Sequence, residues 1–317
     1  MFLLLVLCLR ISPLVASPDS PAFQAQIGRA VDYLVNRFNP TIGLIYESDD
    51  HGKHWLTSEF KDFRWEYRQT YWLYSDNLFA AYALQPYRPD ISAQIQSALN
   101  RYRVSPSGLF ELVIGDQVLT IRNAVDYIIE SSPEFIVVAR RHDSPILSYG
   151  LYADLICYRA LQLFLEGRIN EAHRSFRQAV SLWSGKGLDD WSYTIVDGFY
   201  SNQKLALLLY TSKVLAMNFA AFTETEYHLW RMQQDDGGLA ALSDSEGRPM
   251  GSSNTETTSL ALLIYNESLI RFIQSKSNAQ DKALWVFCVV SLLFSLVTAG
   301  SFFKLGISKK HRSDVRS

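Results

Sequence analysis

The feature that most constrains this chain is an uncharged apolar run near its C-terminus. From Ala283 to Phe303 the sequence reads ALWVFCVVSLLFSLVTAGSFF, without a charged residue. As a helix with a rise of ~1.5 Å per residue, this run spans ~30 Å, the thickness of the hydrocarbon core of a bilayer. Five basic residues follow it within residues 304–317, as is typical of the cytoplasmic side of a membrane helix. We therefore predict a transmembrane helix at 283–303 that binds the lipid bilayer, and a cytoplasmic tail at 304–317; the alternative is a buried core helix.

The N-terminus predicts export of the segment that follows it. Phe2 to Leu9 is apolar and is followed by the small pair Ala16-Ser17, which indicates a signal peptide over residues 1–16. The first basic residue, Arg10, follows the apolar run instead of preceding it, so an uncleaved anchor is the alternative. Either reading predicts a single-pass type I protein of the cell membrane, with its N-terminal domain outside and its C-terminus in the cytoplasm.

Charge and cysteine content narrow the class of domain. The net charge is −2, and because the tail is basic, the remainder is more acidic than this value. Nucleic acid is therefore not an expected partner. Cys8 and Cys288 lie in the predicted leader and membrane helix, which leaves Cys157 alone and excludes a disulfide framework. The extracytoplasmic segment 17–275 must be stabilised by packing, and it is long enough for one large core.

Hydrophobic periodicity predicts that this domain is mainly α. Phe23–Phe38 and Asn170–Trp183 each carry one apolar stripe, which is typical of helices with one buried face. Tyr149–Leu165, Leu205–Met217 and Leu260–Ile273 are apolar on most sides and should be covered on most sides. This order favours two layers of helical hairpins, with an irregular helical bundle as the alternative.

Two regions break the helical pattern. Leu109–Arg122 contains two β-prone runs around Gly115-Asp116, and Glu134–Arg140 adds a third, so we predict a small β-hairpin insertion at about 109–140. Thr41–Arg68 is rich in charged and aromatic residues. We expect it to form a long loop over one end of the domain, and loops of that length are often functional.

One segment resembles a known superfamily. Trp230–Ile264 reads WRMQQDDGGLAALSDSEGRPMGSSNTETTSLALLI, in which a Gln and an Asp-Gly-Gly turn precede a helix that opens with Thr and continues rich in Ala and Leu. This resembles the hairpin repeats of the α/α-toroid proteins, which include terpenoid cyclases, thioester domains of complement-like proteins and six-hairpin glycosidases. The resemblance implies an α/α toroid of helical hairpins. Glycine at the turn has a physical reason, because a positive φ ends a helix at little cost.

The resemblance transfers no active site. Leu239 stands where the repeats carry an aromatic residue after Asp-Gly-Gly, and the acid-rich metal motifs and the Cys-Gln thioester pair are absent. His51 and His54 with Asp49 or Asp50 could share a metal, but surface loops collect such residues by chance. We predict no metal and no cofactor.

Carboxylates are the better candidates for chemistry. Glycosidic cleavage needs two carboxyl groups, one of which is kept protonated by its surroundings. The acids expected near the N-terminal ends of inner helices are the candidate catalytic residues Asp76, Asp197, Asp236 and Glu256. The aromatic residues expected to stack on sugar faces are Trp72, Tyr74, Trp191 and Tyr200. The alternative for each acid is a helix cap or turn former, and for each aromatic residue a place in the core.

Three classes of function remain open. The domain could bind or process carbohydrate at the cell surface, possible glycoside hydrolase-like activity being one form of this. It could bind a glycan or an envelope protein without catalysis. It could also be a non-catalytic structural or protein-interaction module of the cell envelope. Convergence of the candidate acids across an open recess would favour the first class.

Overall fold

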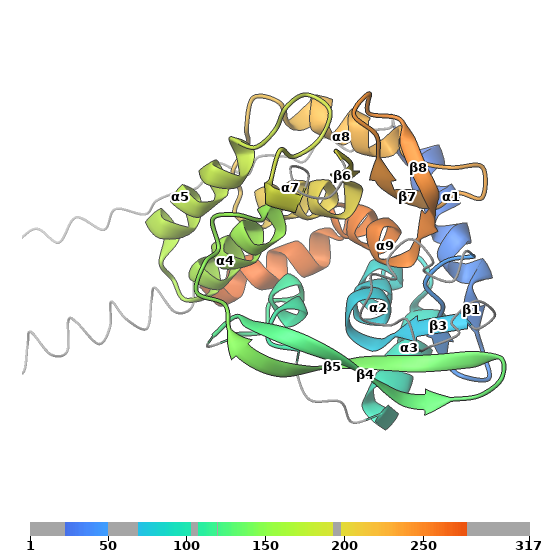
Figure 1. Ribbon diagram of the computed structural model, residues 1–317. Helices are drawn as coiled ribbons and strands as arrows, with labels where there is room; N and C mark the ends of the chain where they lie inside the picture. The colour runs from blue at the N-terminus through green and yellow to red at the C-terminus, as the bar shows by residue number, and fades with distance from the viewer. Residues whose placement is uncertain (1–22, 50–68, 103–106, 119, 193–197, 278–317) are drawn as a thin grey trace, which may run out of the picture.

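The structure is a computed structural model that describes residues 23–49, 69–102, 107–118, 120–192 and 198–277 (Figure 1). Its α-helices are α1 (Gln24–Asn36), α2 (Phe79–Leu84), α3 (Pro89–Tyr102), α4 (Ala153–Leu165), α5 (Ile169–Val180), α7 (Asn202–Val214), α8 (Phe222–Trp230), α9 (Thr255–Leu263) and one at residues 267–277. The structure also has a π-helix, η4 (Leu73–Leu78), and a 3-10 helix, η5 (Phe110–Ile114). The strands are β1 (Phe38–Asn39), β2 (Leu44–Ile45), β3 (Gln69–Trp72), β4 (Arg122–Ser131), β5 (Phe135–Pro145), β6 (Tyr200–Ser201), β7 (Leu239–Ser243) and β8 (Pro249–Asn254).

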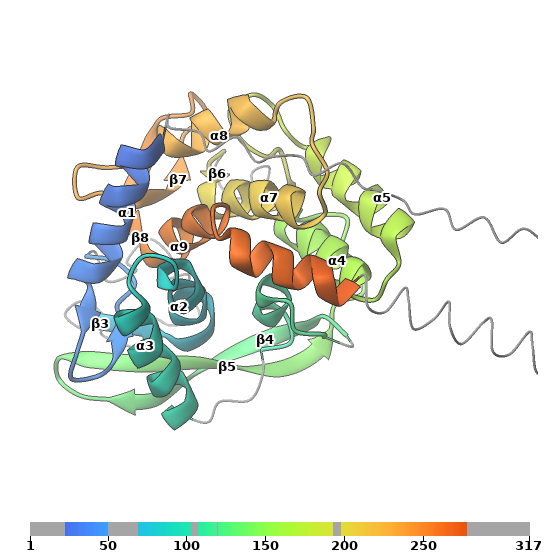
Figure 2. The ribbon, with the colours of Figure 1, turned by 180° about the vertical axis from the view of Figure 1, so that it is seen from behind.

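Four helices form an inner row in the order α4, α7, α9, α2 (Figures 1 and 2). Each packs against an outer helix: α5 covers α4, α8 covers α7, α1 covers α9 and α3 covers α2. The sequence explains this division, because α7 and α9 are buried on nearly all sides, whereas α5 buries only the stripe of Ala172, Phe176 and Ala179. The predicted alternation of covered and half-exposed helices is confirmed for these elements.

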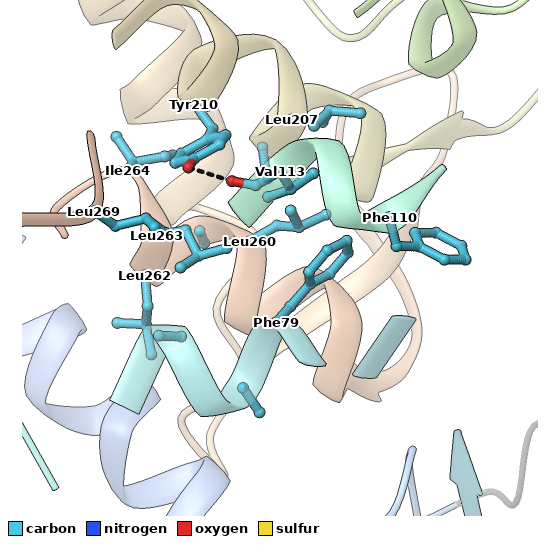
Figure 3. Close-up of a cluster of buried hydrophobic side chains, with 14 of the residues drawn as sticks. Phe79, Phe110, Val113, Leu207, Tyr210, Leu260, Leu262, Leu263, Ile264 and Leu269 are labelled. Atoms are coloured by element: carbon cyan, nitrogen blue, oxygen red, sulfur yellow. Dashed lines mark hydrogen bonds between the residues drawn. The ribbon is translucent and has the colours of Figure 1, made fainter. Parts of the chain in front are cut away.

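The core is built where α2, α7, α9 and η5 meet (Figure 3). Phe79 on α2 and Phe110 on η5 lie edge to face, with ring centroids 5.6 Å apart. Tyr210 on α7 donates its hydroxyl proton to the carbonyl oxygen of Val113 on η5 at 2.6 Å. Leaving such buried groups unpaired would cost on the order of 1–3 kcal/mol each. This bond therefore fixes η5 between the inner helices.

Three small sheets lie within the described ranges. The largest has the order β3-β5-β4, in which β4 and β5 form an antiparallel hairpin and β3 runs parallel to β5. This hairpin extends along one side of the helices, and β5 contacts η4 (Figure 1). The other sheets are β6-β7-β8 and β1-β2.

This architecture contradicts the predicted fold class. An α/α toroid would be mainly helical, whereas about half of the structure is helix and 19% is strand. Between α4 and α2, where a further helical hairpin would continue a ring, the single 3-10 helix η5 packs against both. The likeness of Trp230–Ile264 to toroid repeats therefore describes a local turn and helix, and it does not extend to the whole domain.

The β-hairpin also lies later in the chain than predicted. Leu109–Arg122 was expected to form it, but Phe110–Ile114 is the helix η5, and β4 pairs with β5 instead. Every residue of η5 is buried, and a short apolar run that is buried on all sides lacks the alternation that separates strand from helix. Gly115 ends η5 with a φ of 80°, the left-handed conformation common after a helix C-terminus. The strand predicted at Glu134–Arg140 does form, as part of β5.

None of the helices within the described ranges is long and apolar enough to cross a membrane. The predicted signal peptide (1–16), membrane helix (283–303) and basic tail (304–317) all lie outside those ranges. These three segments, and the type I orientation inferred from them, stay predictions from the sequence.

The Asp-Gly-Gly turn allows β7 to approach α1 closely. Gly237 has a φ of 91°, and a Cβ atom there would lie 2.3 Å from the carbonyl oxygen of Arg29. A Cβ atom on Gly238 would lie 2.4 Å from the ring of Tyr33. The Gln233 side chain donates to the carbonyl oxygen of Gln26, also on α1, at 2.7 Å. Both glycines are therefore required by this contact between two distant parts of the chain.

Replacing Gly237 should destabilise the fold through this contact. We expect Gly237→Ala to lower the free energy of unfolding by about 2–4 kcal/mol, because the new methyl group meets backbone and the left-handed φ becomes strained. Urea unfolding followed by circular dichroism measures the change. The control is Gly28→Ala on α1, where a Cβ atom would meet nothing within 4 Å; it should be neutral or stabilise by up to about 1 kcal/mol. Equal losses in the two variants would contradict the prediction.

Candidate functional site

The N-terminal ends of the inner helices carry a group of polar side chains. Asp76 lies in η4 directly before α2, Asp154 lies in the first turn of α4, and Glu256 lies in the first turn of α9. Gln203, in the first turn of α7, donates to Glu256 Oε1 at 2.6 Å. Helix N-termini carry partial positive charge, which suits acidic side chains. The inner row therefore gathers ionisable groups from distant parts of the chain.

The π-helix η4 is fixed to strand β2 by Asn77. This fully buried side chain accepts from the backbone N–H of Ile45 at 2.7 Å and donates to the carbonyl oxygens of Ile45 at 2.9 Å and Trp72 at 2.8 Å. Glu47 follows β2 by two residues, and its negative charge acts on Asp76. Because π-helical turns are rare and often occur at functional sites, the region around η4 is a candidate functional site. We call Glu47, Asp76 and Glu256 the acid cluster.

Glu47 is held by three neighbours. Its backbone N–H donates to Thr70 at 2.9 Å, and its carbonyl oxygen accepts from the N–H of Thr255 at 2.9 Å. The indole Nε1 of Trp72 donates to Glu47 Oε2, also at 2.9 Å. The side chain is buried. These bonds connect the segment after β2 with β3 and with the start of α9, which places Glu47 near both other acids.

Glu256 has a pKa close to neutrality. Burial raises its pKa to about 7, the charge of Arg140 works against this rise, and the charges of Glu47 and Asp154 add to it. The residue is nevertheless only half-buried. A glutamate that keeps part of its surface accessible and has a pKa near neutrality can exchange a proton with a bound molecule.

Asp76 lies deeper than Glu256. Its exposed fraction is 2%, and Ser75 Oγ donates to its Oδ1 at 2.9 Å. Its Oδ2 atom has no hydrogen-bond partner among the residues that the structure describes. Burial raises the pKa of Asp76 well above its ordinary value, and the charges of Glu47 and Glu256 raise it further. These effects favour the protonated form of the carboxyl group, whose proton Oδ2 could donate.

Arg140 brings positive charge to the acid cluster without pairing with it. Its Nε donates to Asp126 on the neighbouring strand at 2.6 Å. Its guanidinium carbon lies 5.6 Å from the ring centroid of Trp72 and 5.1 Å from that of Phe110. The charge of Arg140 lowers the pKa of both Asp76 and Glu256.

A second charged group lies beside the acid cluster. Lys204 Nζ donates to Asp190 Oδ2 at 2.5 Å and to Ser192 Oγ, and lies 3.9 Å from Asp154 Oδ1. Burial opposes the charge of Asp190, but its hydrogen bonds with Lys204, Ser192 and the Ala153 N–H lower its pKa on balance. This network fixes residues 190–192, which include Trp191, whose exposed fraction is 45%.

The structure brings two of the four predicted catalytic acids together. Asp76 and Glu256 belong to one cluster and interact electrostatically. Asp236 lies in the turn before β7, where it accepts from the Gly238 N–H at 3.0 Å and from Ser253 Oγ at 2.7 Å. Its Oδ2 also pairs with Arg37 at 3.2 Å, so its visible role is to form a turn. Asp197 lies outside the described residues.

Of the four predicted aromatic residues, two lie near the site and two lie elsewhere. Trp72 contacts Glu47, and Trp191 is exposed beside the Lys204 network. Tyr74 instead lines a pocket of about 320 Å³, together with Leu73, Leu78, Tyr82, Gln96, Leu99 and Asn100. Tyr200 is buried against Gly187, where a Cβ atom would lie 2.2 Å from its ring.

Glu47 and Arg140 were not predicted from the sequence. Glu47 follows β2 and Arg140 lies on β5, and both reach the site only through tertiary contacts. Glu47 also lies within Thr41–Arg68, the segment expected to be functional.

The metal alternative gains no support from the described part of the chain. No group of three His, Cys, Asp or Glu side chains there is arranged to hold a metal ion. His51, His54 and Asp50 lie outside the described residues, whereas Asp49 pairs with Arg37.

Comparison with known proteins identifies no family. No protein-family model, no curated protein and no solved structure matches this chain. The functional argument therefore depends on the geometry of its own residues.

The raised pKa of Glu256 makes stability dependent on pH. The folded value is about 7, above the ~4.3 of an unfolded glutamate. The folded state therefore holds this proton more tightly than the unfolded state. The resulting stabilisation of the fold is fully present below about pH 4.3 and is lost as pH rises through 7. At about 1.4 kcal/mol per pKa unit, the loss from pH 4.5 to 8 is on the order of 2–3 kcal/mol. The pKa of Asp76 is raised too and acts in the same direction.

Glu256→Gln should reduce this dependence while keeping an acceptor for Gln203. We expect the variant to lose less stability than the wild type between pH 5 and pH 8, as measured by urea unfolding at both values. The control is Glu246→Gln, at a side chain that is 65% exposed, which should leave the difference unchanged. A Glu256→Gln variant with the full wild-type dependence would show that the carboxyl group does not titrate as described.

Proposed function

We propose that the acid cluster catalyses acid–base hydrolysis of a glycosidic bond. The observation that carries this proposal is a half-buried carboxyl group, Glu256, whose pKa of about 7 lies beside two further acids. A general acid works best when its pKa lies near the pH of the reaction. Glycosidic cleavage requires one carboxyl group that holds a proton and one that is ionised.

The environments of the three acids suggest different roles. Glu256 donates a proton to the leaving oxygen. Glu47, whose negative charge raises the pKa of both other acids, activates water or attacks the sugar carbon. Asp76, whose pKa is raised by burial, binds substrate. Burial raises the pKa of the Cys157 thiol, which makes this cysteine a poor nucleophile.

Aromatic residues support carbohydrate as the substrate class. Trp72 adjoins Glu47 and keeps part of its surface accessible, and Trp191 is exposed beside the Lys204 network. Aromatic rings present large apolar faces together with a polar edge, which suits a sugar ring with one apolar face and several hydroxyl groups.

Removing the proposed general acid should abolish turnover. We expect Glu256→Gln to lower kcat/KM on disaccharides about 10³-fold, within the usual contribution of a general acid. On 4-nitrophenyl glycosides the loss should be much smaller, because nitrophenolate leaves without a proton. The assay uses purified full-length chain with disaccharides and nitrophenyl glycosides of glucose, galactose, mannose and N-acetylglucosamine.

The matched control for this experiment is Asp236→Asn. Asp236 forms the turn with Gly238 and Ser253, so the variant should keep its activity while losing some stability with the Arg37 pair. Equal losses for both substrate classes in Glu256→Gln would contradict its role as the general acid. Loss of activity in a stably folded Asp236→Asn variant would contradict the assignment of the site.

A second candidate is a glycan-binding domain without hydrolysis. The depth of Asp76, at 2% exposure, favours this candidate, because a carboxyl group fixed in a buried place can orient a bound hydroxyl group. Binding of a disaccharide by the wild type, without cleavage over many hours, would favour it over the enzyme.

A further inference from the structure

The side chain of Gln203 is in direct contact with the proposed general acid. Its Nε2 donates to Oε1 of Glu256 at 2.6 Å, across the contact between α7 and α9. These two helices lie side by side in the inner row (Figure 1), and both residues are half-buried in the first turns. An amide group this close to a carboxyl group affects which of its oxygens holds the proton.

The backbone on both sides of Gln203 is fixed. Asn202 has an exposed fraction of 1%, and its side-chain amide donates to the carbonyl oxygen of Ala240 on β7 at 2.9 Å. Lys204 donates to Asp190 Oδ2 at 2.5 Å. Gln203 therefore projects from a turn whose neighbouring residues are held by β7 on one side and by Asp190 on the other.

The backbone that carries Glu256 is fixed as well. Asn254 caps α9 by accepting from the N–H of Thr257 at 3.0 Å. The N–H of Thr255 donates to the carbonyl oxygen of Glu47 at 2.9 Å. The hydrogen bond from Gln203 therefore joins two rigid turns, and it orients the carboxyl group of Glu256 between them.

The two oxygens of this carboxyl group have different tasks. Oε1 accepts the N–H of Gln203. In a neutral carboxyl group the carbonyl oxygen is the better acceptor, and the other oxygen carries the proton. The proton of neutral Glu256 therefore resides on Oε2.

We infer that Gln203 is a positioning residue, which binds Oε1 of Glu256 so that Oε2 holds the proton and transfers it to the leaving oxygen. This role deepens the proposed function and rests on it. In that step the O–H bond at Oε2 releases its proton, and the glycosidic C–O bond breaks with its electron pair on the leaving oxygen. Glu47, or the water that it activates, forms the new bond to carbon. The N–H of Gln203 then donates to a carboxylate, and a hydrogen bond to an ionised acceptor is stronger than one to a neutral acceptor.

The test replaces Gln203 by methionine, which has a similar length and lacks the N–H group. The substrates are maltose, cellobiose, lactose and N,N′-diacetylchitobiose, with purified full-length chain. We expect Gln203→Met to lower kcat about tenfold and to change KM little, because Gln203 contacts Glu256 and not the sugar. Loss of the donor should also raise the pKa of Glu256 by about one unit, so the fall of kcat/KM at high pH should move upward by the same amount.

A second measurement does not depend on activity. Urea unfolding between about pH 5 and about pH 9 follows the stabilisation that is lost as Glu256 ionises. In Gln203→Met this loss should extend to higher pH, because the folded pKa is raised further above the unfolded value. In a Glu256→Gln background the same substitution should leave the pH dependence unchanged, as expected when both changes act on one hydrogen bond.

The matched control is Gln274→Met. Gln274 is also half-buried, and its amide donates to the carbonyl oxygens of Lys213 and Val214 at 3.1 and 3.2 Å. This variant should lose stability by the same amount at every pH, and it should keep the wild-type kcat and pH profile. A Gln203→Met variant that behaves like this control would overturn the positioning role.

The outcomes also separate this inference from the proposed hydrolysis. Cleavage by Gln203→Met with wild-type kcat and an unmoved pH profile would support hydrolysis and overturn the role of Gln203. A wild type that cleaves none of the four disaccharides would contradict hydrolysis, and with it the transfer of the proton to a leaving oxygen. A shifted pH dependence of unfolding in Gln203→Met would in that case still support the orientation of Glu256 by Gln203.

Discussion

The Asn77 side chain joins the two segments on which the candidate site depends. It uses three of the hydrogen bonds open to a side-chain amide, to both backbone groups of Ile45 and to the Trp72 carbonyl oxygen. Because the exposed fraction of Asn77 is 0%, solvent does not compete for these hydrogen bonds. They hold η4 in its π-helical conformation against β2, and so bring Glu47 beside Asp76. An apolar residue at position 77 would leave several buried backbone groups without partners.

The cations near the acid cluster are already paired with other carboxylates. Arg140 is bound by Asp126 and Lys204 by Asp190, at 2.6 and 2.5 Å. The charge of Arg140 partly offsets the cost of burying Glu256, and the charge of Lys204 partly offsets the cost of burying Asp154. A cation paired directly with Glu256 would hold that residue as an inert carboxylate. The separate ion pairs therefore leave the pKa of Glu256 raised.

The sequence located part of this site for a sound physical reason. Asp76 and Glu256 were predicted because each precedes an apolar helix, and inner helices that lie side by side do bring their first turns together. Arg140 could not be predicted, because its position depends on the parallel pairing of β3 with β5, which no local pattern encodes. The Asp-Gly-Gly turn suggested a toroid, but its glycines are required by a close contact with α1. Such a contact can occur in many folds, so the motif did not determine the architecture.

The bonds between Thr255 and the segment after β2 have a consequence for synthesis of the chain. The Thr255 N–H donates to Glu47, and its hydroxyl donates to the carbonyl oxygen of Tyr46. Residues separated by most of the domain must therefore meet before the site exists. The ribosome synthesises the N-terminal half before α9. The first helices and strands therefore lack their contacts with α9 until the later part of the chain has been made. Contacts of such high sequence separation slow folding, and partly folded chains expose apolar surface. The site is therefore among the last parts of this protein to form during translation.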